Sequence, residues 1–327
     1  MKAIVVHRKE GDGAPSLQWE EVADPEYGPE EVLVDVRAAA VNRADLSQAR
    51  GNYPPPPGVT EILGLEMAGV IDAVGDDVQG WRRGDRVCAL LPGGGYAEKA
   101  AVHADMLLRL PDDWTFEQGA AVPEVWYTAY VNLFLEGALQ EGETVLLHAG
   151  GSGVGTAAIQ LARESGARVF ITAGAPEKLE KGQALGASLA VNYKEQDFTE
   201  PVREATGGEG VDMILDPVGA NYFARNLRLL KANGRLVQIG LLSGAQAEIN
   251  LGLVLGKSLR IIGSRLRPRP LSEKIAITRR FEEEVWPLLR SGTVEPIIDS
   301  VFPLEEAGKA HEYVREDRNT GKVILQR

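Results

Sequence analysis

The sequence predicts an α/β protein in which a barrel-like β domain accompanies a doubly wound parallel sheet. Residues 1–124 form a series of short apolar patterns separated by turn signals, which is typical of an antiparallel β domain. From residue 143 onward, strand and helix patterns alternate, as a parallel sheet with crossover helices requires. We therefore expect a first domain at 1–124, a second domain with the parallel sheet at 125–265, and a return segment at 266–327 that completes the first domain.

Composition excludes several classes of protein. A length of 327 residues suggests about two domains, and 44% hydrophobic residues are enough for a sizeable core. The net charge of −12 argues against nucleic acid as a partner, and no apolar run approaches the roughly 18 residues of a membrane span. Cys88 is the single cysteine, so an internal disulfide is excluded. Because Met1 to Val6 reads as a first strand and not as a signal peptide, we expect a cytoplasmic protein.

The elements of the first domain follow from alternating or clustered apolar residues. Turn signals at 11–13, 75–77 and 92–95 separate strands that are predicted at 2–7, 17–22, 31–39, 66–74, 86–91 and 97–102. A short helix is expected over 42–48, and 115–135 has the spacing of two helices broken near Pro123.

The second half of the chain has the period of a parallel α/β domain. Strands are predicted at 144–147, 168–173, 189–193, 211–216, 235–240 and 259–264. Helices are predicted at 155–165, 176–185, 200–205 and 222–230, the last of which is expected to stop at Gly234. The tail is expected to contain one long helix over 271–290 and strands at 300–302 and 322–325.

A glycine-rich turn follows the first strand of this sheet. The stretch from Gly150 to Gly155 reads Gly-Gly-Ser-Gly-Val-Gly and leads into an amphipathic helix. Such a turn directs backbone N–H groups and the positive end of a helix at a phosphate, which predicts a dinucleotide site at Gly150, Ser152, Gly153 and Val154. Ser152 stands where the usual G-x-G-x-x-G pattern has glycine, and its hydroxyl could donate to a pyrophosphate. The alternative is a flexible loop between strand and helix.

The end of the second strand indicates which dinucleotide is bound. An NAD enzyme usually has an Asp or Glu there that accepts a hydrogen bond from the ribose 2′-hydroxyl. Here the strand ends Ile-Thr-Ala-Gly174, without an acid, and Lys178 follows at the start of the next helix. We therefore expect NADPH, with Gly174 leaving room for the 2′-phosphate and Lys178 supplying positive charge. The alternative for Lys178 is an ordinary solvated helix lysine.

Several ordered motifs carry a resemblance that covers essentially the whole chain. The motifs are Val41-Asn-Arg-Ala-Asp45, Gly51-Asn-Tyr-Pro-Pro-Pro56, Leu63-Gly-Leu-Glu-Met-Ala-Gly69, Gly80-Trp-Arg-Arg-Gly-Asp-Arg-Val87, Leu91-Pro-Gly-Gly-Gly-Tyr-Ala97, Ala120-Ala-Val-Pro-Glu124, His148-Ala-Gly-Gly-Ser-Gly-Val-Gly-Thr156 and Gly321-Lys-Val-Ile-Leu325. This set resembles the zinc-independent quinone oxidoreductases of the medium-chain dehydrogenase/reductase superfamily, and most of all their p53-inducible type. The resemblance implies a GroES-like β-barrel domain and a Rossmann domain.

The resemblance also implies roles for individual residues. Asn42 and Thr128 would lie near the nicotinamide, Tyr193 would flank the adenosine phosphate, and Tyr53 would line the acceptor cleft. Further cofactor contacts are implied for Gly219, Gly240, Leu241, Leu242, Ser264 and Leu266. Simpler roles remain open for three of these residues: packing for Tyr53, and turn formation for Asn42 and Gly219.

Zinc can be judged from the residues that would bind it. A catalytic zinc site needs three protein ligands from Cys, His, Asp or Glu. Zinc alcohol dehydrogenases of the superfamily have a cysteine where Asn42 aligns and a histidine where Leu65 aligns. Glu66 remains, but one carboxylate is not a site, and the histidines are scattered along the chain. We therefore expect no metal.

These features predict an enzyme, an NADPH:quinone oxidoreductase that transfers hydride or electrons to a small quinone in a cleft between its domains. Tyr53 and Asn42 are the candidate catalytic residues. One alternative is an NADPH-dependent enoyl or alkenal reductase that acts on conjugated carbonyl compounds. Another is a non-catalytic NADPH-binding protein. The strand at 259–264 would be a bare apolar sheet edge, so a homodimer that pairs this edge is expected.

Overall fold

The computed structural model describes residues 1–8 and 15–327, so the turn predicted at 11–13 lies outside the described residues. The chain divides into two compact units. Unit 1 consists of residues 1–127 and 267–327, and unit 2 consists of residues 128–266.

Unit 1 is built on a mostly antiparallel sheet with the strand order β14-β15-β3-β4-β5-β7, in which β6 also pairs with β3. Only the β14 and β15 pair is parallel among the described strands of this sheet. The strands are β3 (Glu31–Val41), β4 (Glu66–Val74), β5 (Arg86–Leu90), β6 (Lys99–His103), β7 (Leu107–Arg109), β14 (Ile298–Pro303) and β15 (Lys322–Gln326).

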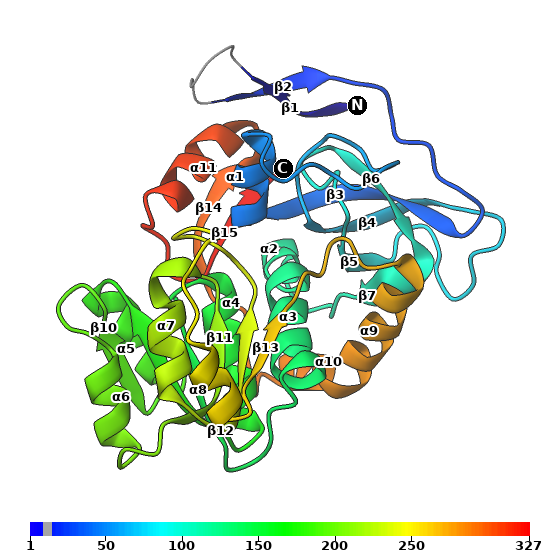
Figure 1. The fold of residues 1–327 in the computed structure, drawn as a ribbon. Helices are drawn as coiled ribbons and strands as arrows, with labels where there is room; N and C mark the ends of the chain where they lie inside the picture. Colours follow the sequence, from blue (N-terminus) through cyan, green and yellow to red (C-terminus); the bar gives the residue numbers. More distant parts are fainter. Residues whose placement is uncertain (9–14) are drawn as a thin grey trace. The chain divides into compact units, whose positions relative to one another are not determined.

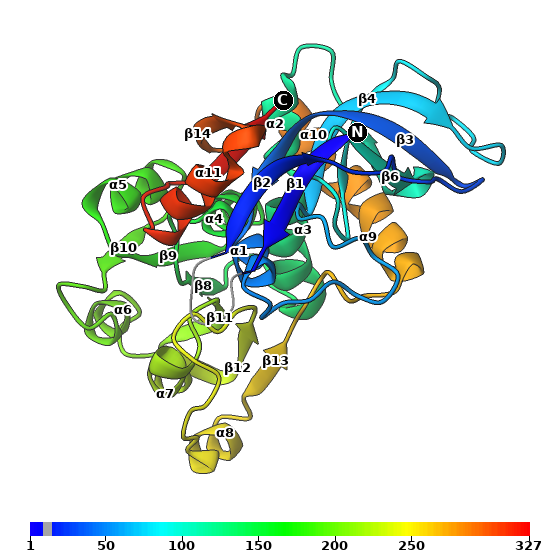
Figure 2. The same ribbon diagram turned by 90° about the horizontal axis from the view of Figure 1, so that it is seen from above.

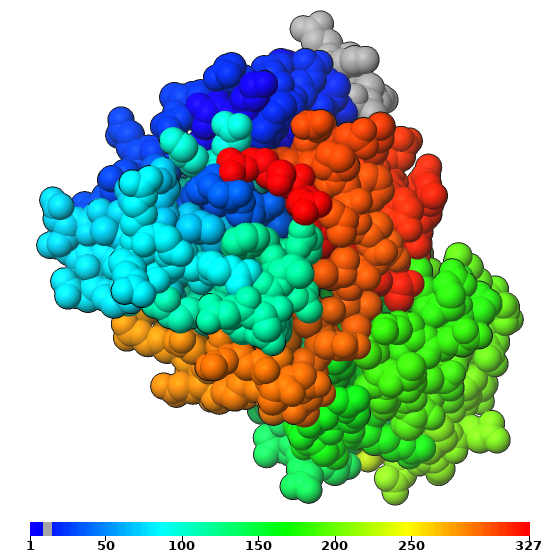
Figure 3. All heavy atoms as spheres, turned by 180° about the vertical axis from the view of Figure 1, so that it is seen from behind, coloured from blue at the N-terminus to red at the C-terminus, as the bar shows by residue number. Residues whose placement is uncertain are grey.

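The first and last parts of the chain meet in unit 1. Strand β15 pairs with β3, so the C-terminal segment completes the sheet that the N-terminal segment begins. Figure 3 shows these two parts of the sequence side by side on one face. A separate hairpin of β1 (Lys2–His7) and β2 (Ser16–Glu21) joins this unit through an antiparallel bridge between Ala3 and Ala97 (Figure 2).

The helices of unit 1 begin where local sequence satisfies their free N–H groups. Thr115 accepts a hydrogen bond from the Gln118 amide at 3.2 Å, and the Gln118 side chain accepts one from the Thr115 amide at 2.9 Å. This capping box starts helix α2 (Phe116–Ala120). The other α-helices described in unit 1 are α1 (Arg43–Ala49), α9 (Leu271–Glu284), α10 (Trp286–Arg290) and α11 (Ala307–Arg315). Helix α3 (Pro123–Tyr130) begins in unit 1 and ends in unit 2, where a π-helical segment (Val131–Glu136) follows it.

Unit 2 is a parallel sheet with the strand order β10-β9-β8-β11-β12-β13. The chain starts in the centre at β8, winds outward through β9 and β10, and then returns to wind the other way, which confirms the predicted doubly wound α/β fold. Figure 1 shows the sheet with its helices around it. The strands are β8 (Thr144–Leu147), β9 (Arg168–Ala173), β10 (Leu189–Asn192), β11 (Val211–Asp216), β12 (Leu230–Gln238) and β13 (Arg260–Gly263).

Helices connect these strands. They are α4 (Gly153–Glu164), α5 (Pro176–Ala184), α6 (Thr199–Ala205), α7 (Ala220–Leu229) and α8 (Leu251–Gly256). The apolar stripe predicted for α4 is buried, as Ala157, Ala158, Leu161 and Ala162 all lie in the core. Burial of this stripe fixes the helix against the sheet, so its N-terminal turn is held at the carboxyl edge of the strands.

Three predictions about elements were wrong. The helix expected over 271–290 is two helices, α9 and α10, because Pro287 in the first turn of α10 has no N–H to continue the earlier helix. The strand expected to begin at residue 235 begins at Leu230. Gly234, which was expected to end the preceding helix, lies inside β12. Asn233 adopts a left-handed φ of 63° there, and the pairing with β11 shifts register, so the strand bends without ending.

Further elements were missed. No element was predicted for β7, α8 or α11. The buried face of α11 contains Ala307, Ala310, His311 and Val314, which have helical spacing but little apolar bulk. None of the helices in the described ranges 1–8 and 15–327 combines the length and the hydropathy that crossing a membrane requires.

Candidate functional site

The glycine turn lies at the carboxyl edge of the parallel sheet in unit 2. Ser152 is the N-cap of α4, and its Oγ accepts a hydrogen bond from the Gly155 amide at 3.0 Å. The cap uses a lone pair of the serine oxygen, so its O–H remains a donor. A serine at this position therefore starts the helix and also offers a hydroxyl beside the first-turn N–H groups of α4, which have no intrahelical partners.

Glycines let the turn pack closely against its neighbours. A Cβ on Gly155 would lie 2.4 Å from the Ala149 carbonyl oxygen, and one on Gly150 would lie 2.8 Å from Ile171 Cβ. Both distances are too short for real side chains, so larger residues would move the helix away from the strand. Gly153 and Val154 form the first turn of the helix and are partly exposed.

Lys178 is not an ordinary solvated lysine. Its side chain is only 5% exposed, and its stem packs along the glycine turn. A Cβ built on Gly151 would lie 2.8 to 2.9 Å from Cβ, Cγ and Cδ of Lys178. The absence of a side chain at Gly151 therefore allows a lysine from the first turn of α5 to lie against the turn that follows β8.

A second lysine that the sequence analysis missed lies at the neighbouring strand end. A Cβ on Gly174 would lie 2.7 Å from the Tyr193 hydroxyl and 2.8 Å from Lys194 Cε. Gly174, Tyr193 and Lys194 are thus packed together where β9 and β10 end. The signal was present in the sequence, because Lys194 directly follows Tyr193, and parallel neighbours end at the same edge of a sheet.

The remaining cofactor candidates of unit 2 follow β11, β12 and β13, mostly at the same edge. Gly219 has a φ of 90° at the start of α7, and a Cβ on Gly240 would lie 2.7 Å from the Pro217 carbonyl oxygen. Leu241 and Leu242 are 55% and 59% exposed, while Ser264 and Leu266 are buried. Thr128 lies in α3, where its carbonyl accepts a hydrogen bond from Asn132 at 2.7 Å.

A buried hydrogen-bond chain holds several of these strand ends together. His148 bonds to the Thr172 hydroxyl and to Asn226 Oδ1, both at 2.9 Å. Asn226 Nδ2 donates to Asp216 at 3.0 Å, and Asp216 accepts from the amides of Val218 and Gly219. Burial lowers the pKa of His148 to about 4, so the ring is neutral and donates from Nε2 to the Asn226 oxygen. The chain therefore links β8, β9, α7 and β11.

Unit 1 contains the two candidate catalytic residues. Asn42 is buried, and both ends of its amide are in use. Its Nδ2 donates to Glu66 Oε1 at 2.8 Å, and its Oδ1 accepts from Lys322 Nζ at 2.8 Å. Lys322 also donates to Glu66 at 2.6 Å. Asn42 therefore holds a buried ion pair together, and its amide has to leave Glu66 before it can donate to an acceptor.

The start of helix α1, which follows Asn42, is fixed by Asp45. This buried carboxylate accepts hydrogen bonds from the amides of Asn42 at 2.8 Å and Gly64 at 3.1 Å, and from the Tyr96 hydroxyl at 3.2 Å. Burial raises the pKa of Asp45 to about 6. The Tyr96 hydroxyl also forms a hydrogen bond with His311 at 3.1 Å, which connects the start of α1 to α11.

Tyr53 is partly buried in its proline-rich loop, and the guanidinium of Arg267 lies over its ring with Cζ 5.2 Å from the centroid. Arg267 is buried, and its Nε donates to the Pro92 carbonyl at 2.7 Å. The sequence analysis missed Arg267, since nothing in the local pattern shows that residues 53 and 267 meet.

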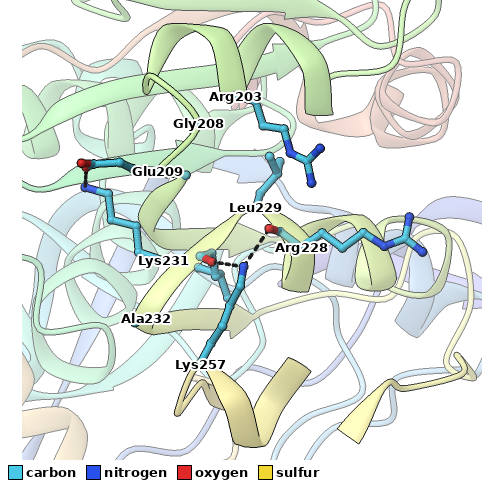
Figure 4. Close-up of a pocket in the computed structure, with 10 residues that line it drawn as sticks. Arg203, Gly208, Glu209, Arg228, Leu229, Lys231, Ala232 and Lys257 are labelled. Atoms are coloured by element: carbon cyan, nitrogen blue, oxygen red, sulfur yellow. Dashed lines mark hydrogen bonds and ion pairs between the residues drawn. The ribbon is translucent and has the colours of Figure 1, made fainter. Parts of the chain in front are cut away.

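A basic cavity lies elsewhere in unit 2. It has a volume of about 520 Å³ and is lined by Arg203, Arg228, Lys231 and Lys257 among others (Figure 4). Lys257 donates to the carbonyls of Arg228 and Leu230, and Lys231 pairs with Glu209 and Asp212. The cavity lies where β11 and β12 begin, at the opposite edge from the glycine turn. Its lysines have structural partners, so we do not regard it as the active site.

No cluster of three or more His, Cys, Asp or Glu side chains suited to a metal ion occurs in the described parts of the chain.

A parallel sheet with a capped glycine turn and lysines at its carboxyl edge, combined with a second β unit, defines a dinucleotide-dependent oxidoreductase.

Two family models match the chain, one in each part of this architecture. A model described as an alcohol dehydrogenase GroES-like domain matches residues 28–112, and a model described as a zinc-binding dehydrogenase matches residues 153–283. A quinone oxidoreductase of Rattus norvegicus is 33% identical, with 99% of this chain and 97% of the relative covered.

Solved structures agree with this assignment. The quinone oxidoreductase of Escherichia coli, solved in complex with NADPH, superimposes with a TM-score of 0.88 at 30% identity, with both chains fully covered. The CurK enoyl reductase superimposes with a TM-score of 0.87 at 28% identity, with 99% of this chain and 98% of the other covered. The chain belongs to the medium-chain dehydrogenase/reductase superfamily, among its quinone oxidoreductases.

Proposed function

We propose that this protein is an NADPH-dependent quinone reductase. The choice of NADPH rests on two lysines. Lys178 lies in the first turn of α5, just after the end of β9 where an NAD enzyme would have a carboxylate, and Lys194 follows the neighbouring strand β10. Lys178 packs on the glycine turn and Lys194 packs beside Gly174. Both cations favour a phosphate on the adenosine ribose, while the α4 N-terminus and the Ser152 hydroxyl suit the pyrophosphate.

When bound, NADPH supplies a hydride, and one further proton converts a quinone to a hydroquinone: Q + NADPH + H⁺ → QH₂ + NADP⁺. If electrons are transferred singly, two quinones each take one electron and a proton is released. In either case the protein has to bind and orient the acceptor, and in the two-electron route the one proton taken up can come from solvent. Tyr53 offers a flat ring on which a quinone can stack and a hydroxyl that can donate to its oxygen.

We propose that the reaction proceeds without zinc. At the positions where zinc-dependent relatives have cysteine and histidine, this chain has Asn42 and Leu65, neither of which binds zinc. The ammonium of Lys322, 2.6 Å from Glu66, already neutralises the remaining carboxylate. The test is elemental analysis of purified protein, in which stoichiometric zinc would contradict the proposal.

A reductase of conjugated C=C bonds is the second candidate, favoured by the likeness to the CurK enoyl reductase. This reaction also needs no metal, but it requires a proton for the carbon next to the carbonyl. Glu124 is a group in unit 1 that can hold such a proton. Burial and the neighbouring Glu66 raise the pKa of Glu124 to about 8, so it is protonated at neutral pH.

Steady-state assays separate these reactions. Purified protein is given NADPH with ortho- or para-quinones in one series, and with 2-alkenals in another. Higher kcat/KM for quinones supports the proposed function, and higher kcat/KM for alkenals replaces it with double-bond reduction. Binding of NADPH without turnover of either class would make the protein a non-catalytic NADPH-binding protein.

We further propose a homodimer that pairs strand β13 with its symmetry mate. Strand β13 is at the edge of the sheet of unit 2, with Ile261 40% exposed. Leu251 and Leu255 of the preceding helix are exposed as well. A bare edge beside apolar side chains is stabilised when a second copy covers it. A cytoplasmic location, expected from the sequence, stays a prediction.

A further inference from the structure

Arg267 has buried hydrogen-bond donors that no group in the described structure uses. Its Nε donates to the Pro92 carbonyl, but Nη1 and Nη2 are buried and have no hydrogen-bond partner. The contact with the Tyr53 ring offsets part of the cost of burying this charge. A ring face, however, cannot replace the in-plane hydrogen bonds that a guanidinium loses on leaving water. Such a group is a candidate for ligand binding.

No charged group in the described structure forms an ion pair with Arg267. Carboxyl groups of Asp45, Glu61 and Glu124 act on it through space only. Glu124 is protonated at neutral pH. Burial lowers the pKa of Lys274, and the charge of Arg267 lowers it further. The guanidinium therefore keeps two buried donor groups that can bind an incoming negatively charged oxygen.

We propose that Nη1 and Nη2 of Arg267 bind the acceptor oxygen that becomes negatively charged on reduction. A quinone that stacks beside Tyr53 would place a carbonyl oxygen near the edge of the guanidinium, because the same ring lies under Arg267. The paired N–H donors of an arginine suit an oxyanion better than they suit a neutral carbonyl. Arg267 is thus a catalytic and specificity-determining residue for acceptors whose reduction yields an oxyanion, such as quinones and enones. This inference rests on the proposed function.

The test compares an anionic with a neutral acceptor analogue. Equilibrium binding of 2-hydroxy-1,4-naphthoquinone, which is ionised at neutral pH, and of neutral 1,4-naphthoquinone is measured on the full chain with NADP⁺ present. R267Q is expected to weaken binding of the anion about tenfold or more and to change binding of the neutral quinone much less. R279Q is the matched control, since Arg279 is exposed and pairs with Asp105 at the surface.

Each alternative has its own outcome. Equal weakening of the anion and the neutral quinone overturns the proposal, as does weakening of NADPH binding alone, which would assign Arg267 to the cofactor. If R267Q does not fold, R267K answers the question: it keeps the charge, so preference for the anion should fall only partly. In R267K, complete retention of the preference for the anion contradicts the proposal, as does an equal loss of affinity for both quinones. Because binding needs no turnover, failure of quinone reduction in the wild type remains a separate result.

Discussion

Lys322 and Glu66 form a buried ion pair in which Nζ lies 2.6 Å from the carboxylate. The lysine also donates to Val41 O and Asn42 Oδ1, and the carboxylate accepts from Asn42 and from the Glu124 amide at 2.8 Å. These bonds satisfy both charges away from water. The pair ties β15, at the end of the chain, to β4 and to the loop that carries Asn42.

Lys322→Met should destabilise the protein by about 3 kcal/mol or more, since it leaves the Glu66 carboxylate buried without its counter-charge. Urea unfolding monitored by circular dichroism gives the free-energy difference. The double variant Lys322→Met, Glu66→Gln should be more stable than Lys322→Met alone, because the buried charge is then removed with its partner. A double variant as unstable as the sum of both single variants would show that the residues act independently.

Lys178→Met should raise KM for NADPH about tenfold and leave KM for NADH nearly unchanged. Methionine keeps the apolar stem that packs on Gly151 and removes only the charge, so the effect reports on the 2′-phosphate. Lys181→Met, three residues further along α5, is the matched control. We expect Lys194→Met to act in the same direction as Lys178→Met. Equal changes for both cofactors would remove Lys178 from 2′-phosphate recognition.

The contribution of the two buried histidines to stability should fall as pH decreases from about 6.5 to 4. Burial lowers the pKa of His148 and of His311 to about 4, so in this range the unfolded chain binds protons that the folded chain does not. Each histidine contributes a slope of about 1.4 kcal/mol per pH unit. The raised pKa values of Asp45 and Asp216, both about 6, and of Glu124, about 8, act in the opposite sense, so the histidine contribution has to be read from a histidine variant and not from the wild-type curve alone.

His148→Gln isolates the histidine term. Between pH 6.5 and 4, the slope of its unfolding free energy against pH should be lower than the wild-type slope by about 1.4 kcal/mol per pH unit, the equivalent of about one proton. His7→Gln, at an exposed histidine, is the comparison. If His148→Gln kept the wild-type slope, the neutral hydrogen-bonded ring described here would be wrong.

Ser152→Ala should cost about 1 kcal/mol of stability through loss of the α4 cap. It should also weaken the binding of NADPH and of NADH to the same extent, because the pyrophosphate is common to both cofactors. Ser152→Thr keeps the hydroxyl and serves as the control. A change confined to NADPH would place the serine near the 2′-phosphate, against the capped geometry of the turn.

Ile261→Glu should convert the proposed dimer to a monomer, because a charge on the exposed face of β13 opposes pairing of two sheet edges. Light scattering at micromolar concentration measures the mass. Leu271→Glu, at another exposed apolar residue, should leave the mass unchanged. A wild-type monomer would contradict the dimer itself.

Long periodic segments were predictable, and features set by tertiary contact were not. Strands β4, β8, β9 and β11 were predicted with their observed bounds, because each is a compact apolar run with clear flanks. Helix α11 was missed, since its buried face is two alanines, a histidine and a valine, and β12 was shortened because Asn233 and Gly234 read as a turn. Local signals cannot show that a strand will accommodate a bulge.

The candidate site shows the same division. The glycine turn and the lack of an acid after β9 are local signals, so the nucleotide site could be proposed from sequence. The partners Lys194, Arg267 and Lys322 come from distant segments or from a neighbouring strand end, and only the fold shows what they contact. Asn42 was predicted as a catalytic residue near the nicotinamide, and the structure adds that its amide is engaged with Glu66 and Lys322.

Cys88 lies in β5 between β4 and β7 and is completely buried. Burial, with a contribution from Glu66, raises the pKa of its thiol, so the sulfur stays protonated as well as shielded. Quinones are electrophiles that form covalent adducts with accessible thiolates. Since the sequence contains no other cysteine, the folded protein should resist arylation by the compounds we propose it reduces, whereas the unfolded chain should not.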